Sequence, residues 1–395
     1  MDRVLREVAL DVIRSSVRGA VATRATAGGF DVRRLPEWAY AQFADQGVKN
    51  MSQQASGVRL EFDTAADLIE LDVLLTRPLA VGLELTARPP IFAAVVDGVE
   101  VDSVAVLDGT VLWLDGGRQR EVPGGSVRVS LALGGSTRSR RVEVWLPHTA
   151  WVEVRAFRAS APVVPAQRSG HIRWVHHGSS ISHCGDADGP LGTWPVIAAR
   201  ALGFDLVNLG FGGNAMLDPF TARTIRDLPA ELITLKVGIN IVNGDAMSRR
   251  TFVPALHGFL DTVRDGHPRT PIVVITPIAC PIHENRPGPT EGDPDAEGLL
   301  RARPRTDAAD RLTVGAVRDA VVEVVGNRRA DDGRIRYLDG RRLLAESDAH
   351  HLHDLLHPDA AGYRLIGRRF AAIARDGASE LDAAIDLARS DLSDS

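Results

Sequence analysis

Side chains that could do chemistry are concentrated in residues 174–185, which read WVHHGSSISHCG. Three later segments are short and polar or glycine-rich: NLGFGGN at 208–214, VGIN at 237–240 and DLLHPDAAGY at 354–363. Together they supply a serine, glycines, asparagines, an aspartate and a histidine. These are the residue types that a serine acyl-transfer site needs.

The spacing of these residues suggests a role for each of them. Ser180 lies in a turn between a predicted strand and a predicted helix, where its hydroxyl is exposed beside the N–H groups of the helix start. Asp354 precedes His357 by three residues, so its carboxylate can orient the imidazole within one loop. The N–H groups of Ser180 and Gly213 and the Asn240 carboxamide could form an oxyanion hole. We therefore predict Ser180, Asp354 and His357 as catalytic residues.

The other polar side chains of 174–185 have simpler interpretations. Ser179 and Ser182 are expected to cap the helix start or to bond nearby backbone. Of the adjacent His176 and His177, one is expected to face the core and the other the site or solvent. Cys184 is expected to be a small buried residue near the site.

Two further patterns in the sequence could indicate a metal site or a nucleotide site. His353 and His357 stand at i and i+4, a spacing that suits zinc. The glutamate of an HExxH motif is missing, however, and Pro358 favours a loop. The GFGG within 208–214 lacks the GxGxxG spacing of a dinucleotide site. Neither a metal nor a cofactor is therefore expected.

The second half of the chain alternates between predicted strands and helices, as in a doubly wound α/β sheet with three layers. Strands are predicted at 172–178, 205–211, 228–240, 271–278 and 334–339, and helices at 192–203, 250–267, about 311–325 and from about 360. The polar segments follow the strands, at the sheet edge where such folds bind ligands. A loop at 281–306, rich in Pro, Gly and charge, is interpreted as a lid or pocket wall.

The first half instead alternates in period two, which indicates strands in an antiparallel sandwich. Strands or hairpins are predicted at 58–64, 67–75, 81–87, 91–107, 110–117, 126–135 and 140–157. Asp97-Gly98 is a hairpin signal, and a short amphipathic helix is expected near residues 4–13. A linker at 159–170 separates the predicted domains, 1–165 and 171–395.

Composition limits the class of protein. Hydrophobic residues make up 44% and charged residues 25% of the 395 residues, as in globular proteins. The net charge of −5 argues against a nucleic-acid partner. Only two cysteines occur, which fits a reducing compartment. Without a membrane-length apolar run or the apolar core of a signal peptide, a cytoplasmic protein with no membrane partner is expected. The oligomeric state stays open.

The four segments, in this order, resemble the SGNH hydrolases, or GDSL lipase/acylhydrolase family, over residues 173–370. The resemblance implies a flavodoxin-like α/β/α domain. It also implies a jelly-roll sandwich, like a carbohydrate-binding module, in front of it. By the same resemblance Ser180 is the nucleophile, and Ser180, Gly213 and Asn240 are the oxyanion residues. Two positions depart from the family, since Ser179 and Ile241 stand where aspartate is usual. No GxSxG motif of ordinary α/β-hydrolases occurs.

The family resemblance implies an esterase or acyltransferase that forms an acyl-enzyme on Ser180. Its substrate would be a small-molecule ester or an acyl thioester such as an acyl-CoA, with a sugar-like or natural-product hydroxyl as leaving group or acceptor. The family includes a branch with a tetracycline-tailoring acyltransferase. Two alternatives stay open: an inactive glycan-binding protein, and, less favoured, a metallohydrolase.

Overall fold

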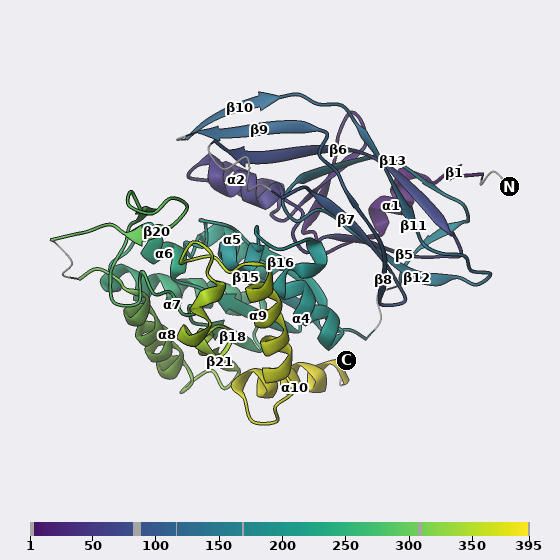
Figure 1. Cartoon of the computed structure of the whole chain (residues 1–395). Helices are drawn as coiled ribbons and strands as arrows, with labels where there is room; N and C mark the ends of the chain where they lie inside the picture. Colours follow the sequence, from purple (N-terminus) through teal and green to yellow (C-terminus); the bar gives the residue numbers. More distant parts are fainter. Residues whose placement is uncertain (1–3, 82–87, 116, 168–169, 307–309, 394–395) are drawn as a thin grey trace. The chain divides into compact units, whose positions relative to one another are not determined.

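The computed structural model describes residues 4–81, 88–115, 117–167, 170–306 and 310–393. The chain divides into two compact units (Figure 1). The first comprises Met1–Ser169 with the short segment Asp188–Leu191, and the second comprises Gly170–Ala187 and Gly192–Ser395.

In its described residues the first unit contains two β-sheets and several short helices. One sheet contains β1 (Arg6–Glu7), β3 (Ala22–Ala25), β4 (Phe30–Arg33), β6 (Leu68–Ala80), β9 (Thr110–Asp115), β10 (Arg118–Val122), β11 (Val127–Ala132) and β13 (Trp151–Ala159). The other contains β2 (Val17–Arg18), β5 (Arg59–Thr64), β7 (Ile91–Val96), β8 (Val99–Ala105), β12 (Arg140–Trp145) and β14 (Val163–Pro165). The helices are α1 (Leu10–Ser15), η1 (Glu37–Gln42) and α2 (Gln46–Gln53).

Alternating residues of both sheets form one hydrophobic core. Leu60 and Phe62 of β5 and Leu71 of β6 are fully buried, whereas Glu61 between the first two is only partly buried. The Phe62 ring meets Phe157 of β13 edge to face, with centroids 5.6 Å apart. Two sheets that share a core through period-two alternation form a sandwich, so the predicted sandwich is confirmed.

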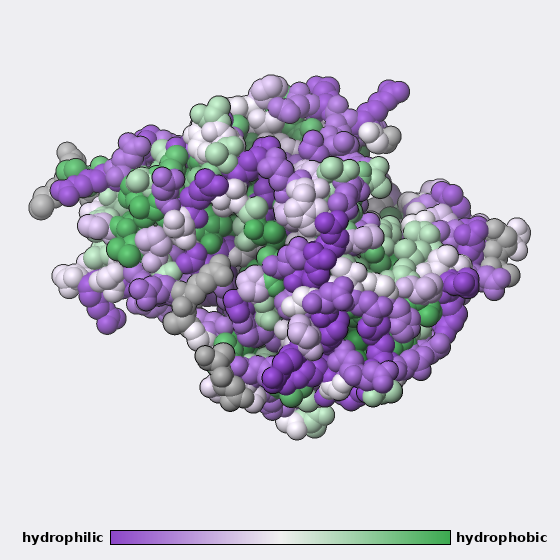
Figure 2. Space-filling view, turned by 180° about the vertical axis from the view of Figure 1, so that it is seen from behind, coloured by the Kyte–Doolittle hydropathy of each residue, from purple (hydrophilic) through white to green (hydrophobic). Residues whose placement is uncertain are grey.

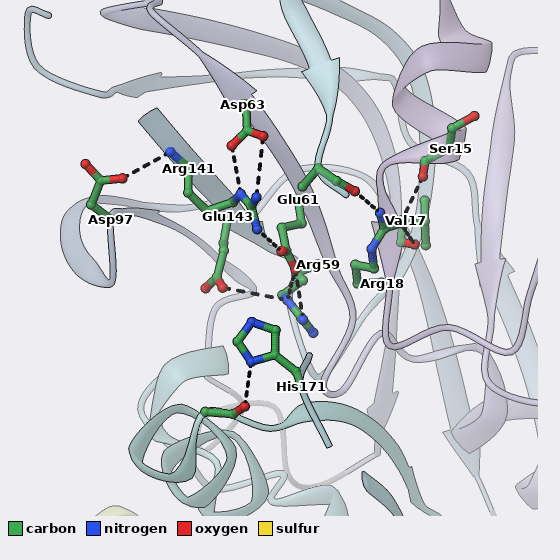
Figure 3. A network of polar contacts seen from close by, with 12 residues as sticks. Ser15, Val17, Arg18, Arg59, Glu61, Asp63, Asp97, Arg141, Glu143 and His171 are labelled. Carbon is green, nitrogen blue, oxygen red and sulfur yellow. Dashed lines mark hydrogen bonds and ion pairs between the residues drawn. The ribbon is translucent and has the colours of Figure 1, made fainter. Parts of the chain in front are cut away.

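The opposite face of β5 and β12 carries a network of charges (Figure 3). In the strand register Glu61 lies directly opposite Glu143, an unfavourable pair of like charges. Two arginines compensate it: Arg141 contacts Glu61 at 2.9 Å and Asp63 at 2.7 Å, and Arg59 contacts Glu61 at 2.9 Å. The charges are therefore satisfied within the sheet.

Several details of the first unit differ from the sequence-based expectation. The Asp97-Gly98 hairpin is confirmed, since it joins β7 to β8 with positive φ at both residues. However, β6 and β9 pair in parallel within an otherwise antiparallel sheet. The expected linker is also wrong in part, because β14 pairs with β5. Most of the strand expected at 81–87 lies outside the described residues.

The second unit is built on a five-stranded parallel sheet with the order β16-β15-β17-β18-β21. The strands are β15 (Arg173–Gly178), β16 (Asp205–Gly210), β17 (Leu232–Lys236), β18 (Ile272–Ile275) and β21 (Ile335–Leu338). The α-helices are α3 (Ser180–His183), α4 (Trp194–Leu202), α5 (Pro219–Asp227), α6 (Ile239–Asn243), α7 (Arg249–Gly266), α8 (Val314–Arg328), α9 (Ala360–Ile373) and α10 (Glu380–Ser393). Every residue of β17 and of β18 is buried, as parallel sheets covered by helices require.

The helices cover the sheet in two groups (Figure 1). Helix α4 packs against α9, and α7 packs against both α5 and α8. The predicted α/β class with a parallel sheet is confirmed. Helices α5 and α10 were not predicted, nor was a small hairpin within 281–306, formed by β19 (Thr290–Gly292) and β20 (Leu300–Ala302).

The strand order brings three of the four segments that carry the predicted site residues (174–185, 208–214 and 237–240) to one edge of the sheet. Strand β15 lies between β16 and β17, and all three run in parallel. Their carboxyl ends therefore adjoin, so the segments that follow them, with Ser180, Gly213 and Asn240, start from neighbouring points. The fourth segment reaches the same edge from the loop between η4 (Glu346–His351) and α9.

Hydrophilic residues predominate on the face seen in Figure 2, with hydrophobic residues in smaller groups between them. Several valines and one leucine of the first unit are the large apolar residues with the greatest exposure, including Val99 and Leu107. Among the residues that the structure describes, no helix has both the length and the apolar composition needed to cross a bilayer.

Candidate active site

Ser180 begins α3 immediately after the carboxyl end of β15. The side chain of Ser179 caps this helix by accepting a hydrogen bond from the Ile181 N–H at 3.2 Å, as predicted. A Cβ atom on Gly178 would come within 2.3 Å of the Ser182 hydroxyl oxygen, so only glycine fits the last position of the strand. Cys184 ends α3 in the left-handed conformation with φ of 64°. The sequence thus forms a tight turn that presents Ser180 at the sheet edge.

His357 joins Ser180 to Asp354. Its Nε2 lies 3.0 Å from the Ser180 Oγ, and its Nδ1 lies 2.6 Å from the Asp354 Oδ2. The other carboxylate oxygen, Oδ1, accepts hydrogen bonds from the N–H groups of Leu356 at 2.9 Å and His357 at 2.6 Å. The structure therefore brings together the three side chains predicted to be catalytic. Ser180 and His357 are 177 residues apart in the sequence.

The charge on Asp354 determines the tautomer of His357. Burial acts to raise the pKa of Asp354, but the hydrogen bond and charge of His357, with two backbone N–H donors, outweigh it and lower that pKa to about 2. A carboxylate only accepts hydrogen bonds, so His357 must carry its proton on Nδ1. The Nε2 lone pair then faces the Ser180 hydroxyl and can accept its proton.

Three predicted oxyanion donors surround the same edge of the sheet. The Asn240 Oδ1 accepts a hydrogen bond from the Ala215 N–H at 3.0 Å, which leaves the NH2 group of Asn240 as a donor. Gly213 has a φ of 71°, a conformation that glycine adopts without strain. Among the described residues, the N–H groups of Ser180 and Gly213 have no protein acceptor. These donors could stabilise a developing negative charge.

A buried hydrogen-bond network supports the turn from the sheet side. His176 contacts the Ser182 Oγ through Nε2 at 2.8 Å and the Thr234 Oγ1 through Nδ1 at 2.7 Å. The Asn208 side chain donates to the Ser182 carbonyl at 2.9 Å. His177 is buried as well and bonds the Leu209 carbonyl through Nδ1 at 2.8 Å. The expectation that one of the two histidines faces the site or solvent was therefore wrong.

Removing His176 should destabilise the fold. We expect His176→Phe to lower the free energy of unfolding by about 1–3 kcal/mol, because the hydroxyls of Ser182 and Thr234 would lose a buried partner. Urea unfolding measures this loss. In a Ser182→Ala background the same change should cost less, since one of the stranded hydroxyls is already gone. Equal costs in both backgrounds would show that the contact does not stabilise the turn.

Cys184 is fully buried and its thiol donates to the Ile181 carbonyl at 3.2 Å. Burial raises the pKa of the Cys184 thiol well above its usual value, which disfavours the reactive thiolate. This agrees with its prediction as a small buried residue. His353, considered above as a zinc ligand, points its Nε2 towards Asp186 at 3.5 Å. In the part of the chain that the structure describes, no group of three or more potential metal ligands occurs.

Residues 281–306, predicted as a lid or pocket wall, make polar contacts with residues on both sides of the site. The Leu300 N–H of β20 donates to the Asp354 carbonyl at 3.1 Å. On the other side, Arg305 and Arg311 form ion pairs with Asp245, which follows α6 and Asn240. A cavity of about 570 Å³ lies at this second contact, lined by Gly244, Asp245, Pro289, Arg303, Pro304, Arg305 and Thr306.

The chain is similar to known proteins in sequence and in structure. Residues 177–365 match the GDSL-like lipase/acylhydrolase family, a span that includes the three later segments in full and the first one from His177 onwards. A comparison with curated protein sequences gave no match.

Solved structures extend the similarity to both units. The salicylyl-acyltransferase SsfX3 from a tetracycline biosynthetic pathway is 28% identical, with a TM-score of 0.73 over 91% of this chain and 94% of that one. A GDSL-like lipase from Bacteroides ovatus is 18% identical, with a TM-score of 0.65 over 94% and 98% of the two chains. A family 2 carbohydrate esterase with a carbohydrate-binding domain, from Corynascus thermopiles, is 13% identical, with a TM-score of 0.55 over 84% and 95%. The second unit therefore matches the GDSL/SGNH hydrolase family over most of its length.

Proposed function

We propose that this protein is a serine enzyme that transfers an acyl group through an ester on Ser180 to a small-molecule hydroxyl or to water. The observation that carries the proposal is the continuous chain of contacts from Ser180 Oγ to His357 Nε2 at 3.0 Å and from His357 Nδ1 to Asp354 at 2.6 Å. The family match supports ester chemistry in general. The similarity to a salicylyl-acyltransferase supports transfer to a natural-product hydroxyl.

The proposed reaction proceeds in two halves. His357 Nε2 accepts the Ser180 hydroxyl proton as Oγ bonds to the acyl carbon of an ester or thioester. The tetrahedral oxyanion is held by the N–H groups of Ser180 and Gly213 and by the Asn240 side chain. As the acyl carbon loses the alcohol or thiol, His357 gives that group its proton. An acceptor hydroxyl or water then gives its proton to His357 and bonds to the acyl carbon. The bond between that carbon and Ser180 Oγ breaks, and His357 returns the proton to Oγ.

Two measurements test this proposal. A fluorophosphonate probe should label the wild-type protein at Ser180, as read by peptide mass spectrometry. Incubation with acyl-CoA and acyl-phenol donors and a panel of sugar and phenolic acceptors should then give acylated acceptors or free acid. Absence of both the label and any product would contradict the proposal and favour a binding protein instead.

Asn240 provides a separate test of the oxyanion hole. We expect Asn240→Ala to lower kcat for phenyl acetate by about 100-fold to 1,000-fold. The Asn240 side chain would donate a stronger hydrogen bond to the oxyanion of the transition state than to the carbonyl of the bound ester. KM should change little. Asn243→Ala, in the same short helix, is the matched control and should stay within a few-fold of wild type. Similar losses in both variants would indicate damage to α6 rather than loss of a donor.

A further inference from the structure

A second histidine–aspartate contact lies beside the proposed catalytic pair. His353 Nε2 and Asp186 Oδ2 are 3.5 Å apart. The two residues come from different segments: Asp186 follows the turn that carries Ser180, and His353 immediately precedes Asp354. No sequence motif connects them, so this contact appears only in the folded chain.

The local backbone fixes the position of His353 relative to the proposed base. The His353 N–H donates to the His357 carbonyl at 3.1 Å, and Leu352 pairs with Pro358 in an isolated bridge. The imidazole rings of His353 and His357 are stacked, with centroids 6.5 Å apart and planes 27° apart. His353 therefore lies on the flank of the imidazole that exchanges protons with the substrate.

The two pairs differ in their access to solvent. The side chains of Asp354 and His357 are 12% and 24% exposed, whereas those of His353 and Asp186 are both 45% exposed. Among the described residues, neither His353 Nδ1 nor Asp186 Oδ1 has a protein partner. The second pair therefore leaves one nitrogen and one carboxylate oxygen free to contact a ligand.

The charges of the second pair support each other. The contact with Asp186 raises the pKa of His353, although burial opposes the change. Burial acts to raise the pKa of Asp186, but His353 and, more weakly, His357 lower it. His353 can therefore donate a hydrogen bond from Nδ1 when its ring is protonated, next to a carboxylate that accepts.

The position of His357 indicates which part of a substrate this pair meets. His357 gives its proton to the departing alcohol, so residues beside it adjoin the alcohol part of the ester rather than the acyl part. An anion on that alcohol would be repelled by Asp186, and a cation would be repelled by His353 whenever its ring is protonated. A neutral hydroxyl, which both donates and accepts a hydrogen bond, suits both groups.

We propose that Asp186 and His353 bind a second hydroxyl next to the reacting oxygen, so that the preferred alcohol is a vicinal diol or a 1,2-dihydroxyarene. This inference rests on the proposed acyl transfer through Ser180. Residues that hydrogen-bond a substrate hydroxyl discriminate strongly against analogues that lack it.

Two esters that differ by a single hydroxyl test the inference: 2-hydroxyphenyl acetate and phenyl acetate. We expect wild-type kcat/KM to favour the hydroxylated ester by about 10-fold to 100-fold, as for a hydrogen bond to a charged group. In Asp186→Asn and His353→Gln this preference should fall towards unity, mainly through KM for the hydroxylated ester. Fluorophosphonate labelling of each variant checks that Ser180 is still presented.

His351→Gln is the matched control. His351 lies on the same segment and also contacts a carboxylate, Asp359, at 3.3 Å, but its ring contacts that of His350, with the two planes tilted by 39°. The His351→Gln variant should prefer the hydroxylated ester to the same extent as wild type.

The outcomes separate this inference from the proposed function. If wild type hydrolyses both esters at Ser180 without preference, or if the preference survives in both variants, the binding role of the pair is wrong while acyl transfer stands. The role is also wrong if both variants lose activity on the two esters equally, because the pair would then act on His357. If wild type reacts with neither ester nor the fluorophosphonate, the proposed function fails, and this inference with it.

Discussion

Ser180→Ala should lower kcat for phenyl acetate by about 10⁴-fold to 10⁶-fold, because the hydroxyl that forms the acyl-enzyme is gone. Residual turnover would come from the oxyanion donors alone. His357→Ala should cause a loss of the same order, and the double variant should be no worse than either single one, since the two groups act as a unit. Steady-state kinetics with purified variants measures all three.

Ser179→Ala is the matched control for this prediction. Ser179 is the neighbouring serine, and its hydroxyl caps α3 through Ile181. Its removal should cost about 0.5–2 kcal/mol of stability. The variant should nevertheless still take the fluorophosphonate on Ser180. Wild-type rates in Ser180→Ala would contradict the mechanism, as would additive losses for Ser180 and His357.

The regular elements of the second unit were predictable because their patterns are local. Helix α4 ends before Gly203, which adopts the left-handed conformation. A glycine after an amphipathic run predicts such an end. Helix α5 was not predicted, because the segment around Pro219 also suits a loop. In the first unit, the pairing of β14 depends on contacts with β5 that no local pattern contains. The Pro and Ser content of residues 159–170 therefore indicated a linker.

The candidate site was predictable to the extent that it lies in motifs. Asp354 and His357 are three residues apart, so their pairing follows from the sequence. The approach of His357 to Ser180 was inferred from the order of the four segments. The contact between Asp186 and His353 was not predicted, because no sequence pattern links the two residues and only the folded loops bring them together. The same is true of the bond between His176 and Ser182.

Asp354→Asn should lower kcat by about 10⁴-fold, less than loss of His357, while leaving the loop folded. The pKa of Asp354 is lowered to about 2, so this change removes a full negative charge at any pH where activity is measured. The amide oxygen can still accept from the Leu356 and His357 N–H groups, as Oδ1 does now. The amide NH2, however, would face His357 Nδ1 and donate to it. That contact favours the tautomer with its proton on Nε2, which cannot accept the Ser180 proton.

Comparison with Asp354→Ala separates orientation of the base from folding of the loop. Alanine removes the acceptors for both backbone N–H groups, so this variant should also lose about 1–3 kcal/mol of stability, whereas Asp354→Asn should unfold close to wild type. The lowered pKa of Asp354 also makes stability depend on pH. Because this pKa is lower in the folded state, the carboxylate contributes stability above its usual pKa of 3.8, and this contribution is lost as the pH falls towards 2. That acid-dependent loss should be smaller in Asp354→Asn. If the asparagine variant keeps wild-type kcat, Asp354 does not orient His357, and its role is only to hold the loop.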